Sequence, residues 1–139
     1  MELQIILSEG AILPSRAHPT DSGLDLYTAE PVILQPNETK IVRTGVTFVI
    51  PEGYEIQVRP RSGVTSKTPL RVHFGTVDQG YTADCSIIVT NTGTESLLLQ
   101  SGHKLAQAVL CPVMILNPIV VTELPKTSRG DKGFGSSGV

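Results

Sequence analysis

Turn residues divide this sequence into short apolar or alternating runs, and this division is the strongest constraint on its fold. Proline and glycine stand at close, fairly regular intervals between the runs. Short runs bounded by such residues are typical of β-strands, and regular spacing of the turns is typical of a barrel or a sandwich. We therefore predict an all-β fold.

Most of the runs are predicted to form strands. They span residues 3–7, 24–29, 32–34, 40–50, 54–59, 70–74, 85–91, 96–100, 105–116 and 119–124. One helical turn is predicted at 62–67. Pro112 is expected at a strand edge or bulge, and Gly45, Gly93 and Gly102 are expected at chain bends.

Length and charge bound the class of protein. A chain of 139 residues predicts one domain with its own core. A net charge of -2 provides no basic field for nucleic acid. No apolar run has transmembrane length, and the run at 3–7 is too short for a signal peptide. We expect a cytoplasmic protein, bacterial or viral in a host cytosol, that binds neither nucleic acid nor membrane.

The two cysteines are read as structural. Cys85 and Cys111 lie inside apolar runs and belong to no Cys/His cluster. Such residues are typically small buried side chains in a reducing compartment. A disulfide between Cys85 and Cys111 is the alternative.

A carboxylate stands in an apolar context at Asp78. The stretch 75–81 lies between the apolar runs 70–74 and 85–89, which predicts two strands joined by a bend that presents Asp78. A carboxylate in such a place costs desolvation energy unless it is paired or used. Asp78 is therefore the first candidate for a functional residue.

Three other places could hold a charged ligand. Arg61, Ser62 and Gly63 follow a predicted strand and could cradle an anion, although an ordinary turn fits the same residues. Asp25 belongs either to a solvated strand face or to outer-sphere support for a hard cation. Gln107 lies between two alanines of an apolar run, where an edge glutamine is the plain alternative.

Several known motifs are absent or incomplete. Gly133, Gly135 and Gly138 match G-x-G-x-x-G, but a dinucleotide site needs a strand before this motif and a helix after it. The sequence contains no G-x-x-x-x-G-K-[ST], and its three histidines lack metal-ligand spacing. A Ser-His-Asp triad stays open, although no G-x-S-x-G nominates a nucleophile.

The end of the chain differs in composition. We divide the chain into a β domain at 1–124 and a flexible tail at 125–139. The tail is rich in glycine and serine, as expected of a frayed terminus. It also carries Arg129, Phe134 and two serines between its glycines, as expected of a segment that closes over a ligand.

Five stretches, in order, resemble the five motifs of the homotrimeric dUTPase family. They are DSGLDLY at 21–27, PRSG at 60–63, GTVDQGY at 75–81, GHKLAQ at 102–107 and RGDKGFGSSG at 129–138. The resemblance runs through the whole chain. It implies a jelly-roll β-barrel, hydrolysis of dUTP to dUMP and pyrophosphate with Mg²⁺, and a homotrimer whose active sites are shared between chains. This activity limits uracil in DNA and supplies dUMP for dTMP synthesis.

The resemblance also implies a role for individual residues. Asp78 is similar to the general base that activates the attacking water, and Asp25 is similar to the carboxylate that holds waters of Mg²⁺. The expected substrate-binding residues are Arg61, Ser62, Gly63, Thr76, Val77, Tyr81, Ser86, Gln107, Arg129, Phe134, Gly135, Ser136 and Ser137. Among them, Tyr81 resembles the aromatic under the deoxyribose, and Phe134 resembles the aromatic over the uracil.

The sequence departs from the family on the side that would read the base. Thr82, Ala83 and Asp84 stand where the family usually has Arg-Gly-Glu, and residues 70–74 offer no asparagine before Gly75. Lys104 replaces a usual arginine. Two alternatives are a regulatory protein on the same fold, which would bind a protein partner in a nucleotide-dependent way, and a related deoxycytidine-triphosphate deaminase. The deaminases generally lack this tail.

Overall fold

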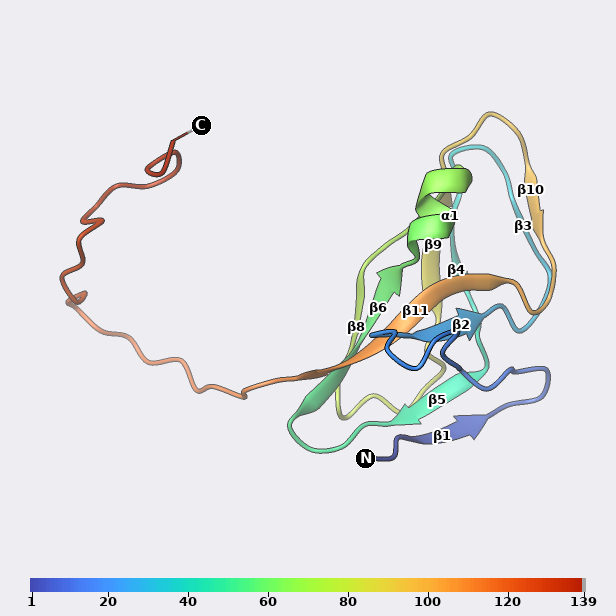
Figure 1. Ribbon diagram of the computed structural model, residues 1–139, viewed down its shortest axis with the longest axis horizontal. Helices are drawn as coiled ribbons and strands as arrows, with labels where there is room; N and C mark the ends of the chain where they lie inside the picture. Colours follow the sequence, from blue (N-terminus) through green and yellow to red (C-terminus); the bar gives the residue numbers. More distant parts are fainter. Residues whose placement is uncertain (139) are drawn as a thin grey trace.

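The computed structural model describes residues 1–138; Val139, the last residue of the predicted tail, lies outside them. The described chain is nearly all-β, as predicted, with one short helix (Figure 1). Its elements are β1 Gln4–Leu7, β2 Leu24–Tyr27, β3 Val32–Leu34, β4 Thr39–Val42, β5 Val46–Val49, β6 Tyr54–Pro60, α1 Ser62–Lys67, β7 Leu70–Val72, β8 Gly75–Val77, β9 Ile87–Asn91, β10 Leu97–Leu99 and β11 Lys104–Pro112.

The strands form a jelly-roll-like body in which strands distant in sequence pair with each other. The largest sheet has the order β2-β11-β6-β8, and a second sheet has the order β4-β9-β7. Two further pairs, β1-β5 and β10-β3, complete the body, and every pair is antiparallel. No helix in the described part of the chain is long and apolar enough to cross a membrane.

A single apolar cluster lies between the sheets. Successive side chains of a strand point to opposite faces, so Ile56 and Val58 of β6 are buried while Gln57 and Arg59 lie on its outer face. The cluster includes Leu26 of β2 and residues from both larger sheets. The core thus joins the sheets into one body.

Gly45, Gly93 and Gly102 all lie where the chain bends or turns between strands, as predicted. The run 40–50 divides into β4 and β5 at Gly45, which has φ +71°. A Cβ at Gly45 would lie 2.6 Å from Oγ of Ser8, so glycine is required there by both conformation and space. Gly102 also has a positive φ, +81°. The predicted helical turn at 62–67 is α1, with the same bounds.

The prediction of a strand–bend–strand unit around Asp78 is wrong in part. Residues 75–77 form a strand of their own, β8, which pairs with β6, whereas β7 pairs with β9. The chain therefore passes from one sheet to the other just before Gly75. Local pattern cannot distinguish these arrangements, because Val72 and Val77 are both buried whichever sheet each joins.

The predicted strands at 113–116 and 119–124 are also absent from the described chain. β11 ends at Pro112, which has no N–H to donate to a ladder. Residues 113–124, which we call the apolar arm, lead away from the body together with the tail (Figure 1). Val113 is half-buried and donates to the carbonyl of Gly53 (2.8 Å), and the arm is exposed from Met114 onward; Val120, for example, is 98% exposed.

A buried asparagine holds the loop between β9 and β10. The side chain of Asn91 is fully buried, donates to the carbonyls of Leu34 (3.1 Å) and Glu95 (2.8 Å), and accepts from Gly93 N–H (3.0 Å). Replacement by alanine would leave these groups unpaired. We expect Asn91→Ala to lower the free energy of unfolding by about 2–4 kcal/mol in urea denaturation. Thr94→Ala, at an exposed position of the same loop, should change it by less than about 0.5 kcal/mol.

Candidate active site

A polar groove lies where β2, β6, α1 and β11 meet. Its volume is about 400 Å³. It brings together all the residues predicted to contact phosphate outside the tail, and it adds Asp25, which was predicted to support a metal ion. Its lining consists of Asp21, Ser22, Gly23, Asp25, Arg59, Arg61, Ser62, Gly63 and Gln107. We call it the anion groove.

Arg61 is oriented by a carboxylate within this groove. Its Nε donates to Oδ1 of Asp25 at 2.9 Å, and Asp25 is 8% exposed. The other oxygen of Asp25 lies 3.3 Å from Nζ of Lys104, which also stands over the ring of Tyr27. The remaining N–H groups of the Arg61 guanidinium have no partner among the described residues, so they are available to an anion.

Close packing places Gln107 at the floor of the groove. Its Nε2 donates to the carbonyl of Pro60 at 2.9 Å, and its side chain lies directly against Gly23. A Cβ at Gly23 would collide with Oε1 of Gln107. Glycine at position 23 therefore leaves room for the side chain of Gln107 in its observed position. The first N–H groups of α1, at Ser62 and Gly63, have no acceptor within the helix and add donors to the same groove.

The anion groove can support a hard cation only in an outer-sphere manner. Both oxygens of Asp25 already face cationic side chains. The described residues contain no group of three or more His, Cys, Asp or Glu side chains arranged to hold a metal. Mg²⁺ commonly keeps several waters and takes one or two carboxylates together with substrate phosphates. The donor set here fits that manner of binding.

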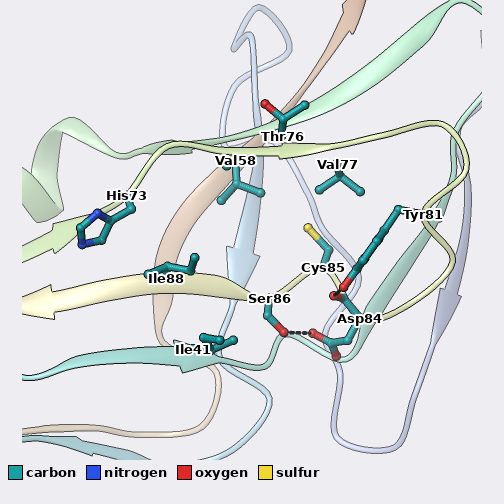
Figure 2. Close-up of a pocket in the computed structure, with 11 residues that line it drawn as sticks. Ile41, Val58, His73, Thr76, Val77, Tyr81, Asp84, Cys85, Ser86 and Ile88 are labelled. Carbon is teal, nitrogen blue, oxygen red and sulfur yellow. Dashed lines mark hydrogen bonds between the residues drawn. The ribbon is translucent and has the colours of Figure 1, made fainter.

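A second, mostly apolar pocket lies between β8 and β9. Its volume is about 270 Å³. Because β8 belongs to one sheet and β9 to the other, the two strands form its opposite walls (Figure 2). The lining contains the predicted residues Thr76, Val77, Tyr81 and Ser86, along with Ile41, Val58, His73, Gly75, Asp84, Cys85 and Ile88. We call it the base pocket.

Asp84 connects the base pocket to the turn between β4 and β5. Its Oδ2 accepts from Gly45 N–H at 2.7 Å, and its Oδ1 accepts from Thr44 N–H at 3.2 Å and from the Ser86 hydroxyl at 2.8 Å. The backbone carbonyl of Asp84 accepts from the hydroxyl of Tyr81 at 2.9 Å. The motif pattern identified position 84 only as a departure, and the structure makes this residue the centre of the pocket's hydrogen bonds.

Asp78 lies outside both of these cavities. It lines a separate hollow of about 290 Å³ with Gly53, Tyr54, Glu55, Gln79, Gly80, Val113 and Ile115. Its backbone carbonyl accepts from Tyr81 N–H at 3.0 Å, which fixes the turn after β8. Within one chain, Asp78 is near the base-pocket residue Tyr81 in sequence, and it is not among the residues of the anion groove.

The predicted tail residues are also separate from both cavities. Arg129 donates only within the tail, to the carbonyls of Lys132 and Gly133. Phe134 is fully exposed, and Gly135, Ser136 and Ser137 are exposed. The predicted site residues thus fall into separate groups: the anion groove, the base pocket, Asp78 and the tail.

Sequence reasoning missed His73 and the role of Asp84. Nε2 of His73 lies 2.8 Å from Oγ1 of Thr90, and the ring lines the base pocket. The signal was the absence of the family's asparagine from residues 70–74, which left this part of the pocket to a different side chain, here His73. The role of Lys104 as a partner of Asp25 was not foreseen either; the substitution of arginine by lysine in that motif was its signal.

Comparison with known proteins identifies the family of this chain. The dUTPase family model matches residues 9–138. The deoxyuridine 5'-triphosphate nucleotidohydrolase of Clostridium novyi (strain NT) is 42% identical over 134 residues, which are 95% of this chain and 94% of the relative. The protein of the same name from Crocosphaera subtropica is 41% identical over 142 residues, which cover 100% of both chains.

Solved structures with this fold include phage dUTPases. The Staphylococcus bacteriophage 80alpha dUTPase with dUPNHPP superposes with a TM-score of 0.92 and 34% identity, covering 99% of each chain. A mutant dUTPase from phage phi11 of S. aureus, solved to reveal the coordination of a structural Mg(II) ion, has a TM-score of 0.84 and 33% identity, covering 88% of this chain and 98% of that one.

The fold is jelly-roll-like and carries two separate cavities, a polar groove that contains an arginine and a mostly apolar pocket. Together with the matches in sequence and structure, they place the molecule in a class of nucleotide hydrolases. The chain belongs to the dUTPase family, and its activity is that of a dUTP diphosphatase.

The buried thiol of Cys85 makes stability sensitive to alkali. Burial, together with the nearby charge of Asp84, raises its pKa from 9.0 to about 12. Above about pH 9 the unfolded thiol ionises while the folded one stays neutral, so stability is present below that pH and lost as pH rises toward 12. We expect this thiol to contribute a loss of about 1.4 kcal/mol per pH unit in urea denaturation between about pH 9 and about pH 10.5.

The contribution of Cys85 can be isolated by comparing variants. Cys85→Ala should have a shallower loss of stability over this pH range than wild type, whereas Cys111→Ala should keep the wild-type slope. Equal slopes for Cys85→Ala and wild type would contradict the assignment. Both thiols are free in the structure, and the predicted reading as buried cysteines holds fully for Cys85, while Cys111 is half-buried.

Proposed function

We propose that this protein hydrolyses dUTP at the α-phosphorus, releasing dUMP and pyrophosphate, in active sites that are shared between the three chains of a homotrimer. The observation that carries the proposal is the anion groove, in which Arg61, Ser62, Gly63 and Gln107 converge on one space beside Asp25. Positioning and electrostatic stabilisation supply most of the catalysis of phosphoryl transfer. A groove with an oriented guanidinium and several N–H donors is suited to that task.

Asp78 is proposed as the general base. It takes a proton from water as the water oxygen bonds to the α-phosphorus, and the bond from that phosphorus to the α,β-bridging oxygen breaks. The electron pair leaves with pyrophosphate. A base placed in this way typically accelerates a reaction ~10²–10⁴-fold. The exposed turn after β8 lets the Asp78 carboxylate meet a substrate that is held mainly by another chain.

The base pocket is proposed to hold the uracil. Strand β8 is an edge strand, bonded to β6 on one side only among the described strands. Backbone groups of Thr76 and Val77 on its free side can therefore pair with a planar ligand, as in strand addition. Ser86 faces them from the start of the opposite wall, and Tyr81 closes one end, where it would lie under the deoxyribose (Figure 2).

Asp25 is proposed to hold waters of Mg²⁺ while it orients Arg61. The bound ion would neutralise charge on the phosphates and hold them in the reactive geometry. Asp25 suits the outer-sphere role because its side chain is buried at the groove and already balanced by Arg61 and Lys104. The residues of this chain that orient the phosphates are Arg61 and Gln107.

Two features of the single chain support the trimer with shared sites. The proposed base Asp78, the anion groove and the tail lie apart, so a complete site needs more than one chain. The apolar arm exposes Met114, Ile115, Leu116, Ile119, Val120, Val121 and Leu124. A run of exposed apolar residues of this kind marks a protein interface. We propose that the arm packs on a neighbouring copy and carries the tail to a distant site.

The tail is proposed to cover the bound nucleotide. Arg129, Ser136 and Ser137 would contact the γ-phosphate, and Phe134 with Gly135 would lie over the uracil. Exposure of all these groups leaves them free to bind. Closure of such a segment excludes water and completes the catalytic arrangement only when substrate is present.

The role of Asp78 predicts a specific loss of rate. Asp78→Asn keeps the size of the side chain but cannot take a proton. We expect its kcat, measured as pyrophosphate released from dUTP with Mg²⁺, to fall ~10²–10⁴-fold while the fold by circular dichroism is unchanged. Glu95→Gln, an exposed carboxylate outside the described cavities, should keep wild-type kcat. Wild-type turnover by Asp78→Asn would refute the assignment.

Shared sites predict complementation between two inactive proteins. A chain ending at Ser128 keeps Asp78 but lacks the tail from Arg129 onward, and full-length Asp78→Asn keeps the whole tail but lacks the base. Each alone should have strongly reduced turnover. When the two are unfolded, mixed and refolded, some sites should combine an intact Asp78 with an intact tail, and pyrophosphate release should exceed the sum of the separate proteins.

The controls for this mixture address assembly and the tail separately. Light scattering should give the mass of three chains for both proteins, since the truncation spares the arm. Mixing without unfolding should give less recovery than refolding. Full activity of the truncated chain would refute the tail's role, and a refolded mixture no more active than its parts would refute sharing of the site.

A further inference from the structure

Both carboxylate oxygens of Asp84 accept hydrogen bonds from neighbouring groups. Its two carboxylate oxygens accept from Gly45 N–H (2.7 Å), Thr44 N–H (3.2 Å) and the Ser86 hydroxyl (2.8 Å), and Nε of Arg43 lies 3.7 Å away. Two of these donors are rigid backbone groups of the buried turn before β5. The carboxylate is therefore fixed in place at the rim of the base pocket.

This fixed carboxylate determines how the Ser86 hydroxyl can interact. A hydroxyl has one proton to donate and two lone pairs to accept with, and an ionised carboxylate can only accept. The Ser86 proton must therefore point to Asp84 (Figure 2). The hydroxyl has no other side-chain partner among the described residues, and Ser86 lines the base pocket. Only lone pairs remain for a ligand there.

We propose that Asp84 is a positioning residue that makes the Ser86 hydroxyl an obligate acceptor, so that the base pocket selects a pyrimidine whose ring nitrogen carries a proton. Uracil presents such an N–H between its two carbonyls. Cytosine presents an unprotonated ring nitrogen at the same place, whose lone pair would face the lone pairs of Ser86. This inference rests on the proposed function, and it adds a reason for rejecting cytosine.

The same residue positions a second group of the pocket. The backbone carbonyl of Asp84 accepts from the hydroxyl of Tyr81 (2.9 Å) and from Ser86 N–H (2.9 Å). A shift of Asp84 would therefore move both the aromatic ring and the hydroxyl that face the ligand. A role limited to holding the pocket together would affect every nucleotide alike, whereas control of the Ser86 proton affects uracil and cytosine differently.

The test compares substrates rather than absolute rates. We would measure kcat/KM for pyrophosphate release from dUTP and from dCTP, together with the affinities of dUMP and dCMP by calorimetry. In Asp84→Asn the amide can donate to Ser86, which frees the hydroxyl proton to turn to the ring nitrogen of cytosine. The preference for the uracil nucleotide should fall about tenfold or more. Asp84→Glu, which keeps a carboxylate, should retain more of the preference.

Ser86→Ala keeps the test decisive if Asp84→Asn does not fold. This variant leaves the contacts of Asp84 with the turn intact and removes only the hydroxyl. The uracil nucleotide should then bind more weakly, with little change for the cytosine nucleotide. Ser96→Ala, an exposed serine whose hydroxyl bonds to Gln35, should keep the wild-type preference.

The possible failures are distinguishable. Equal losses for both nucleotides in folded Asp84→Asn and in Ser86→Ala, with the ratio unchanged within about twofold, would overturn the inference and leave the proposed function standing. Absence of pyrophosphate release from dUTP by the wild-type protein would instead refute the proposed function.

Discussion

The position of β11 between β2 and β6 is the constraint on which the anion groove depends. Its register places Gln107 opposite both Asp25 and Arg59, and so beside Arg61. Side chains alternate between the faces of a strand, so a slip of one residue would turn Gln107 toward the core and an apolar neighbour toward the groove. Burial of Leu105, Ala106 and Ala108 therefore indirectly fixes the geometry of the anion groove.

The base pocket depends on the opposite arrangement, in which two strands do not pair. β8 is bonded to β6, and β9 to β4 and β7. The segment that connects them carries Tyr81, Asp84 and Ser86, which are joined by side-chain hydrogen bonds. The bond from Ser86 ends on a carboxylate, and bonds to a charged group are stronger than neutral ones. A short polar network thus lies beside the base pocket, where no strand ladder forms.

Sequence pattern predicted most of the elements and nominated residues that line the anion groove and the base pocket. Turn residues predicted the all-β class, the helical turn at 62–67 and the bends at Gly45 and Gly102, because each of these depends on neighbouring residues alone. The predictions failed at 75–77 and at 113–124. In both places the residues suit a strand, but whether they form one depends on which edge is available to pair with. Lys104 was missed as a partner of Asp25 because this ion pair forms between strands that are far apart in the sequence.

The order of motifs in the chain was enough to determine the family and to nominate Asp78, Arg61 and Gln107. Those inferences need only residue types and spacing. Tertiary structure decided which nominated residues meet. It brings Asp25, Arg61 and Gln107 together and keeps Asp78 and the tail apart from them within one chain. It also shows that Asp84, which the sequence marked only as a difference from the family motif, is the centre of a hydrogen-bond network. Contacts of this kind form between segments far apart in sequence, so only the folded arrangement specifies them.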